Sequence, residues 1–153
     1  MRDARPRTFI AFSPGFGVTE GDADFSLAAS ARLGRIQRPF LCVTGTLDKA
    51  MIVGHASNAA RRAVYRGLPA GKRAELMLAG ADHMTFSGRD LPVNRSAALQ
   101  REAGAAQLEP GHRAVVAQVT SDWWLWRLLG DDAARLRLVA PAGLSAADIW
   151  QQA

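Results

Sequence analysis

Two residues suited to acid–base chemistry, Asp48 and His83, occupy corresponding places in the sequence. Each follows an apolar run with the character of a buried strand, PFLCVT at residues 39–44 and ELML at residues 75–78. Histidine is the side chain that most often acts as a general base near neutral pH. It works best when a buried carboxylate holds its tautomer and stabilises the imidazolium ion. The two residues therefore predict the acid–base half of a catalytic triad.

A helix is expected between the two strands. Residues 58–66 read NAARRAVYR, and Gly67 and Pro69 behind them are helix-ending signals. A strand–helix–strand unit favours a parallel pair of strands, whose carboxyl ends lie at one edge of the sheet. Because neighbouring strands are about 4.8 Å apart, loops leaving those ends can bring Asp48 and His83 together. Three arginines of this helix are expected to point outward: Arg61, Arg62 and Arg66.

The rest of the chain adds further elements. TFIAF at residues 8–12 predicts a buried strand, which needs neighbouring strands on both edges. Residues 112–129 predict the clearest helix, because apolar residues recur at helical spacing and form a stripe that packs on a sheet. Residues 87–111 are expected to form a cap or insertion over the site, or a loop with a helical turn. Shorter helical segments are expected at 26–33, 133–138 and 145–148. The fold class is α/β, a parallel sheet of at least three strands flanked by helices.

Each residue of the pair also has a purely structural interpretation. An Asp at a strand end often caps a following helix, and His83, in a Gly-Ala-Asp-His loop, can simply hold that loop. The order and spacing of the two residues favour the catalytic interpretation. The adjacent Asp82 is expected to point away from His83 and to contact solvent or backbone. Ser13 ends the first strand at the same edge and is a candidate pocket-lining residue, although FSPGF lacks the G-x-S-x-G pattern of a nucleophile elbow.

No metal or cofactor site is predicted. His55 and His112 have no metal-type spacing to each other or to a pair of carboxylates, and Cys42 has no partner cysteine. Cys42 lies inside a predicted strand and is expected to behave as a small buried hydrophobe. Gly15 and Gly17 form a lone G-x-G without the continuation of a phosphate-binding loop.

Composition is that of a folded soluble domain. The chain has 153 residues, 48% of them hydrophobic and 22% charged, which allows one domain with a core and is too little charge for a disordered chain. The net charge of +5 comes almost wholly from scattered arginines, so no nucleic-acid partner is expected. No stretch has the length of a membrane span or of a signal-peptide core, which predicts a cytoplasmic protein without a membrane partner.

Four stretches resemble the C-terminal half of α/β-hydrolases, in particular the dienelactone-hydrolase-like and platelet-activating-factor-acetylhydrolase-like group. FIAFSPGFG is similar to the strand and loop that follow the nucleophile helix, and PFLCVTGTLDK to the strand that carries the triad acid. LAGADHMTFSG is similar to the catalytic-histidine loop, and VTSDWWLWRLLGDDAARLRL to the terminal helix that packs on the sheet. The resemblance covers most of residues 8–138 and implies that residues 1–153 form a single partial α/β-hydrolase domain.

The resemblance also implies an activity. It implies hydrolysis of a small-molecule carboxylic ester through an acyl-enzyme, with Asp48 as the triad acid, His83 as the general base and no cofactor. The serine and the oxyanion hole of that family would lie upstream of Met1. The chain is then expected to be a fragment that is inactive alone, and its partner is the missing N-terminal half or a second copy of itself.

Two alternatives stay open at this point. In the first, the chain is a non-catalytic remnant or interaction partner that binds another chain through an open sheet edge and the Trp-rich helix. In the second, it is a small hydrolase with an unusual nucleophile, Ser13 or Cys42. A substitution of either residue by alanine that abolished ester turnover would support the second.

Overall fold

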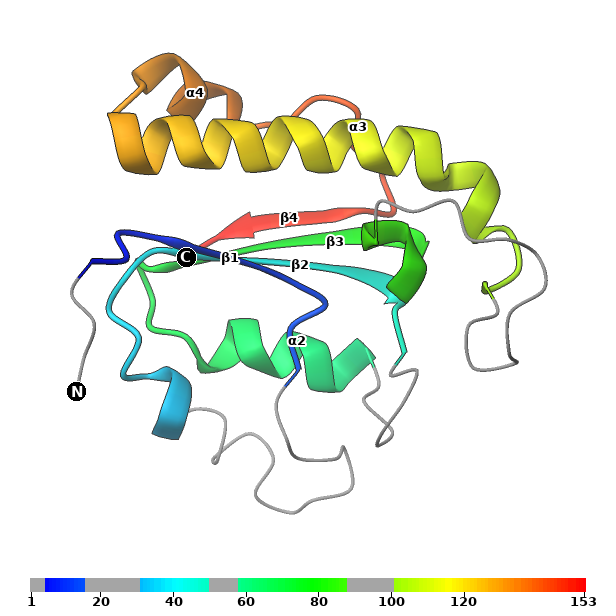
Figure 1. The fold of residues 1–153 in the computed structure, drawn as a ribbon, viewed down its shortest axis with the longest axis horizontal. Helices are drawn as coiled ribbons and strands as arrows, with labels where there is room; N and C mark the ends of the chain where they lie inside the picture. The colour runs from blue at the N-terminus through cyan, green and yellow to red at the C-terminus, as the bar shows by residue number, and fades with distance from the viewer. Residues whose placement is uncertain (1–4, 16–30, 50–57, 88–100) are drawn as a thin grey trace.

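The computed structural model describes residues 5–15, 31–49, 58–87 and 101–153 (Figure 1). Within these residues, four strands form one sheet in the order β1-β2-β3-β4. The first three strands are parallel to one another, and β4 runs antiparallel to β3. The predicted α/β class is confirmed, with a mixed, mostly parallel sheet. The strands are β1 (Phe9–Phe12), β2 (Phe40–Leu47), β3 (Arg73–Asp82) and β4 (Ile149–Gln152).

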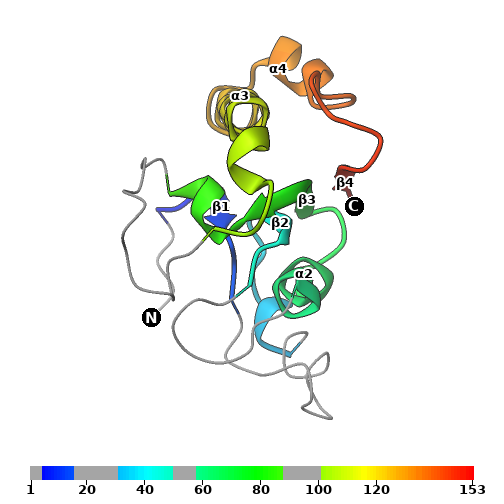
Figure 2. The same ribbon diagram turned by 90° about the vertical axis from the view of Figure 1, so that its right-hand side faces the viewer.

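Helices cover both faces of the sheet (Figure 1, Figure 2). On one face lies α2 (Asn58–Gly67), which follows β2 and precedes β3 in the chain, as predicted. On the other face lies α3 (Ala105–Trp124), which a π-helical turn, η3 (Leu125–Leu129), continues toward α4 (Asp132–Arg137). None of the helices described is both long enough and apolar enough to cross a membrane.

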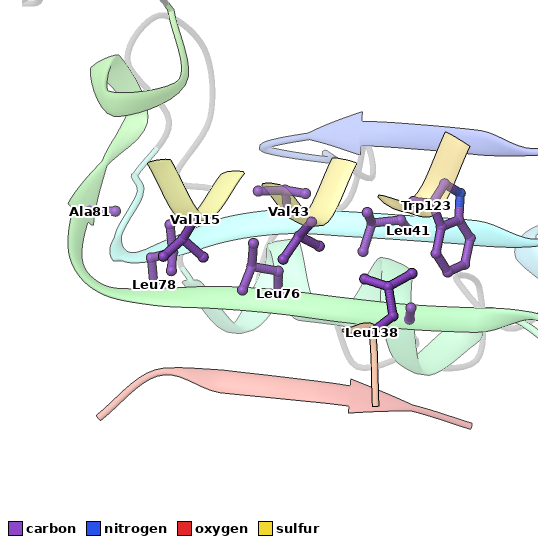
Figure 3. Packing of buried hydrophobic residues seen from close by; sticks show 10 residues of the cluster. Leu41, Val43, Leu76, Leu78, Ala81, Val115, Trp123 and Leu138 are labelled. Carbon is purple, nitrogen blue, oxygen red and sulfur yellow. The ribbon is translucent and has the colours of Figure 1, made fainter. Parts of the chain in front are cut away.

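Side chains of β2 and β3 alternate between the two helical layers, as the two-residue period of a strand requires. Toward α2, Cys42 packs with Val64, Tyr65 and Leu68. Because both faces are covered, the two strands read as nearly continuous apolar runs. Toward α3 and the segment after α4, buried apolar residues interlock in one cluster (Figure 3): Leu41, Val43, Leu76, Leu78, Val115, Val119, Trp123 and Leu138.

The apolar stripe predicted for residues 112–129 is confirmed. Val115, Val119 and Trp123 are buried against the sheet, and the helical segment ends at Gly130, which has φ 74°. The indole Nε1 of Trp123 donates a 2.9 Å hydrogen bond to Thr8 Oγ1. This bond ties the C-terminal half of α3 to the residue that precedes β1.

The predicted start of this helix was wrong, because α3 begins at Ala105 and runs through Pro110. A proline at this position removes one backbone hydrogen bond and bends the helix without ending it. Figure 1 shows the first turns of α3 at an angle to the rest of the helix. Part of the segment expected as a cap or insertion, residues 87–111, is therefore the beginning of α3, and residues 88–100 lie outside the described residues.

The segment expected to open a last helical turn leads instead into β4. Asp148 Oδ2 accepts a 2.7 Å hydrogen bond from the Ser145 amide, as the expected cap would. Its Oδ1 accepts another, also 2.7 Å, from the Ala79 amide of β3. The carboxylate thereby ties the turn to the sheet, and Ile149 pairs with Met77. The prediction of a helical turn was wrong because the open edge of β3 offered backbone partners.

Strand β1 is an edge strand that pairs with β2 alone among the described residues. Phe12 is 46% exposed, so the expected buried strand with a neighbour on each side is not found there. The amides of Phe9 and Ser13 donate toward the β2 side, to carbonyls at 2.9 and 2.7 Å. Since successive residues of a strand face opposite sides, the amides of Ile10 and Phe12 point to the free edge.

Candidate functional site

The carboxyl ends of β2 and β3 meet where the sequence places the two titratable residues. β2 ends at Leu47, and Asp48 follows it. β3 ends at Asp82, and His83 opens a short 3₁₀ helix, η1 (His83–Phe86). Leu47 pairs with Asp82 in the ladder, so the next residue of each strand leaves the sheet beside the other. The parallel pair therefore positions Asp48 and His83 as predicted.

The two strands approach each other very closely just before the site. The register shifts between Gly45 and Leu47, and a Cβ added at Gly45 would lie 2.0 Å from the carbonyl oxygen of Ala81. Only glycine fits such a contact between backbones. This contact draws the last residues of β2 and β3 together.

His83 and Asp48 form a hydrogen-bonded pair. His83 Nδ1 lies 2.9 Å from Asp48 Oδ1. A carboxylate only accepts hydrogen bonds, so His83 donates through Nδ1–H and leaves Nε2 as the nitrogen that can take up a proton. Asp48 is fully buried, whereas 40% of the His83 side chain is exposed. The acid is thus out of water and the imidazole remains accessible, which is the arrangement a general base needs.

A hydroxyl donor and a guanidinium ion also contact the Asp48 carboxylate. The hydroxyl of Thr44 donates to Oδ2 at 2.9 Å, and Arg61 Nε lies 2.9 Å from Oδ1. Thr44 stands on β2 and is itself buried. Both carboxylate oxygens therefore have partners, which fixes the plane of the group that His83 meets.

Arg61 and Thr44 are site residues that sequence reasoning missed. Arg61 was expected to point outward from α2, but its side chain is only 5% exposed. Charged residues of a predicted helix are normally assigned to its solvent-exposed face. This rule fails where the charged side chain is buried and forms an ion pair with another buried residue. A signal was present, since Arg61 shares a helix face with Tyr65, four residues on, which is buried.

Asp82 supports the turn that carries His83. Its Oδ1 accepts from the Thr85 amide at 2.9 Å, and the Asp82 amide donates in return to the Thr85 hydroxyl oxygen at 3.1 Å. Arg101 adds contacts to both carboxylate oxygens, at 2.9 and 3.1 Å. Burial alone would raise the pKa of Asp82, but the hydrogen bonds from Arg101 and Thr85 outweigh it and hold the pKa below its usual 3.8. The prediction that Asp82 contacts solvent or backbone is confirmed by the backbone amide of Thr85, and the residue is buried.

Ser13 lies at the same edge of the sheet, in an unusual conformation. It has φ 47°, and its carbonyl oxygen accepts a 2.6 Å hydrogen bond from Arg61 Nη1. Its Oγ is buried without a hydrogen-bond partner among the described residues. Ser13 thus contributes its backbone to the site, and its lining of a pocket stays a prediction.

Of the other residues considered from the sequence, Cys42 and His112 form no hydrogen bond or ion pair with Asp48 or His83 in the described structure. Cys42 is buried on the α2 side of the sheet, and burial raises the pKa of its thiol to about 12. His112 is on α3, and His55 lies outside the described residues. Among the residues that the structure describes, no group of three or more His, Cys, Asp or Glu side chains is arranged to hold a metal ion.

Comparison of the chain with protein-family models, with curated proteins and with solved structures finds no match. Conclusions about function therefore rest on the geometry of Asp48, His83 and the groups around them.

Proposed function

We propose that this chain supplies the acid–base half of a serine hydrolase that acts on small carboxylic esters. The observation that carries the proposal is the 2.9 Å contact between His83 Nδ1 and the buried carboxylate of Asp48. A purely structural histidine has no need of a buried carboxylate on one ring nitrogen and an accessible second nitrogen. A general base needs both.

The chemistry assigned to the pair is proton transfer. His83 Nε2 takes the proton from a serine hydroxyl as its oxygen attacks the ester carbonyl carbon, and Asp48 stabilises the resulting imidazolium. The imidazolium then gives that proton to the departing alkoxide, leaving an acyl-enzyme. In the second half-reaction His83 takes a proton from water as the water oxygen attacks the acyl carbon. The bond between the acyl carbon and the serine oxygen then breaks, and the imidazolium returns the proton to the serine oxygen, which releases the carboxylic acid and restores the enzyme.

The nucleophile of this reaction is assigned to a segment outside residues 1–153. Neither candidate within the chain suits the role. Ser13 has a buried Oγ, and Cys42 keeps its proton at neutral pH inside the α2-side core. The resemblance to α/β-hydrolases supports an upstream strand followed by G-x-S-x-G, with the oxyanion hole beside it.

The test begins with the coding sequence upstream of Met1, read in frame. A G-x-S-x-G after a strand pattern is the expected result, and the extended product should then hydrolyse p-nitrophenyl acetate. His83→Gln and Asp48→Asn in that product are expected to lower kcat by roughly 10³- to 10⁴-fold. The matched control is His112→Gln, which removes a histidine outside the site and should leave kcat unchanged.

Two results would overturn this proposal. One is an upstream sequence without any nucleophile motif. The other is turnover by the extended product that His83→Gln leaves intact.

A second function, binding of another chain, is favoured by the outer edge of β1, which no other strand of the described residues covers. The outward amides of Ile10 and Phe12 can extend a sheet, and Phe12 is exposed. On the Trp-rich helix, Trp123 is buried against the sheet, whereas Trp124 is 39% exposed. Ile10→Pro removes an outward donor and spares the bonds to β2, so it should abolish any self-association detected by light scattering. Self-association that persists in Ile10→Pro would exclude this edge.

A further inference from the structure

The guanidinium of Arg61 contacts several groups at the site. Its Nε lies 2.9 Å from both Oδ1 and the backbone oxygen of Asp48. Its Nη1 donates to the Ser13 carbonyl at 2.6 Å, and its Nη2 to the Lys49 carbonyl at 3.2 Å. One guanidinium from α2 therefore binds the chain that leaves β1, the chain that leaves β2 and the carboxylate itself.

The same guanidinium also lies beside the imidazole. Arg61 Nη2 is 3.4 Å from His83 Nδ1. A guanidinium only donates, so it would bind Nδ1 only if that nitrogen carried no proton. That would set the Nδ1 lone pair against Asp48 Oδ1 at 2.9 Å. The shorter contact to the carboxylate decides the competition, and Nδ1 carries the proton.

The tautomer of His83 depends on the position of the Asp48 carboxylate. Asp48 Oδ1 forms an ion pair with Arg61 and a hydrogen bond with His83, while Oδ2 accepts from Thr44. Without Arg61, the Thr44 hydroxyl is the one other group among the described residues that would orient the carboxylate before His83 binds it. The buried charge of Asp48 would also lose the cation that compensates it.

We propose that Arg61 is the positioning residue of this site: it fixes the Asp48 carboxylate and so holds His83 in the Nδ1–H tautomer with Nε2 free. The inference deepens the proposed function and rests on it for its catalytic meaning. The geometry itself can be tested on the 153-residue chain without any turnover.

Arg62, the next residue of α2, provides a matched control. It forms a bidentate pair with Glu75, at 3.0 and 2.9 Å, and Glu75 is fully buried. Both arginines thus neutralise a buried carboxylate that stands on the sheet. Only Arg61 reaches Asp48 and His83, so the two variants separate general stability from positioning.

The experiment compares Arg61→Met and Arg62→Met by two-bond proton–nitrogen correlation spectra of isotope-labelled histidine. The pH is kept at roughly 8, where imidazoles are mostly neutral. The wild type and Arg62→Met should show His83 as a single Nδ1–H tautomer. Arg61→Met should lose that pattern and show a resonance of the Nε2–H tautomer. A folded Arg61→Met that keeps the wild-type pattern would overturn the proposal.

A second variant covers the case in which Arg61→Met does not fold. Arg61→Lys keeps the charge, but an ammonium group lacks the planar fork that spans several acceptors. It should fold and still show the Nε2–H resonance, and an unchanged Nδ1–H pattern in it would equally refute positioning by the guanidinium. The two experiments test separate claims. An unchanged tautomer in the Arg61 variants would refute positioning by Arg61 and would not affect the proposed hydrolase activity. A failure to hydrolyse the ester would refute the hydrolase proposal and would not affect the tautomer result.

Discussion

Gly45→Ala is expected to damage both the fold and the site, although Gly45 has no side chain that could contact Asp48 or His83. Its carbonyl oxygen accepts a 3.2 Å hydrogen bond from the Asp48 amide. The added Cβ would lie 2.0 Å from the oxygen, 2.6 Å from the carbon and 2.7 Å from the Cβ of Ala81. Two of these atoms belong to the backbone of the neighbouring strand, so no flexible side chain can turn away. Relief to an ordinary carbon–oxygen contact of about 3.3 Å requires β2 and β3 to separate by about 1 Å.

The magnitude follows from that separation. Overpacking a well-packed core costs about 1–3 kcal/mol, and the rigid neighbours here place Gly45→Ala near about 3 kcal/mol. For a chain of this size, each kcal/mol lowers the melting temperature by about 2–4 °C, so a fall of about 6–12 °C is expected. Opening by about 1 Å would also stretch the 2.9 Å contact between Asp48 and His83 beyond hydrogen-bond length.

Thermal unfolding followed by circular dichroism measures the first effect, and the histidine spectra described above measure the second. The control is Gly111→Ala, because a Cβ there meets nothing within 4 Å and alanine favours a helix by about 0.5–1 kcal/mol. Gly111→Ala should therefore be slightly more stable than the wild type. Equal melting temperatures for Gly45→Ala and the wild type would show that the strands are not in contact as described.

Three other changes have expected outcomes. Arg101→Gln should cost about 1 kcal/mol at neutral pH, a modest value because Arg101 is partly exposed. Because the pKa of Asp82 is lowered on folding, its carboxylate stabilises the folded state at pH values above its usual pKa of 3.8, and this stabilisation is lost as the pH falls through the pKa of the folded state. In urea titrations, the difference in free energy of unfolding between Arg101→Gln and the wild type should therefore disappear in acid. Alkylation of Cys42 at pH 8 should be at least about 10³-fold slower in the native protein than in urea, because the thiol is buried and protonated. Thr8→Val should lower the free energy of unfolding by about 1–3 kcal/mol, since it leaves the Trp123 indole N–H unpaired, whereas Thr8→Ser should restore most of it.

The sequence was most informative where local chemistry and regular periodicity agree. Asp48 and His83 were predictable because each stands behind an apolar strand, and parallel pairing of those strands fixes where their carboxyl ends lie. The stripe of α3 was predictable because Val115, Val119 and Trp123 repeat at four-residue spacing.

Tertiary context decided the features that were missed. Arg61 was assigned to solvent because its pairing with Asp48 becomes visible only when α2 is placed under the sheet. Ile149–Gln152 carries no clear period, and its strand exists because β3 presents an edge to it. The helix predicted over residues 112–129 begins earlier, at Ala105, because the packing of α3 outweighs the local cost of Pro110 to the helix.

The hydrogen bond between Trp123 and Thr8 has a consequence for the order in which the protein forms during synthesis. The two residues are 115 positions apart. At ribosomal rates of roughly 5–20 residues per second, Thr8 would wait roughly 6–23 s for its partner to be made. β2, α2 and β3 have by then been synthesised, but the sheet face that α3 covers would still be bare. A nascent chain of this protein therefore passes through a stage at which Leu41 and Leu76 face water, and that stage is when a chaperone would bind it.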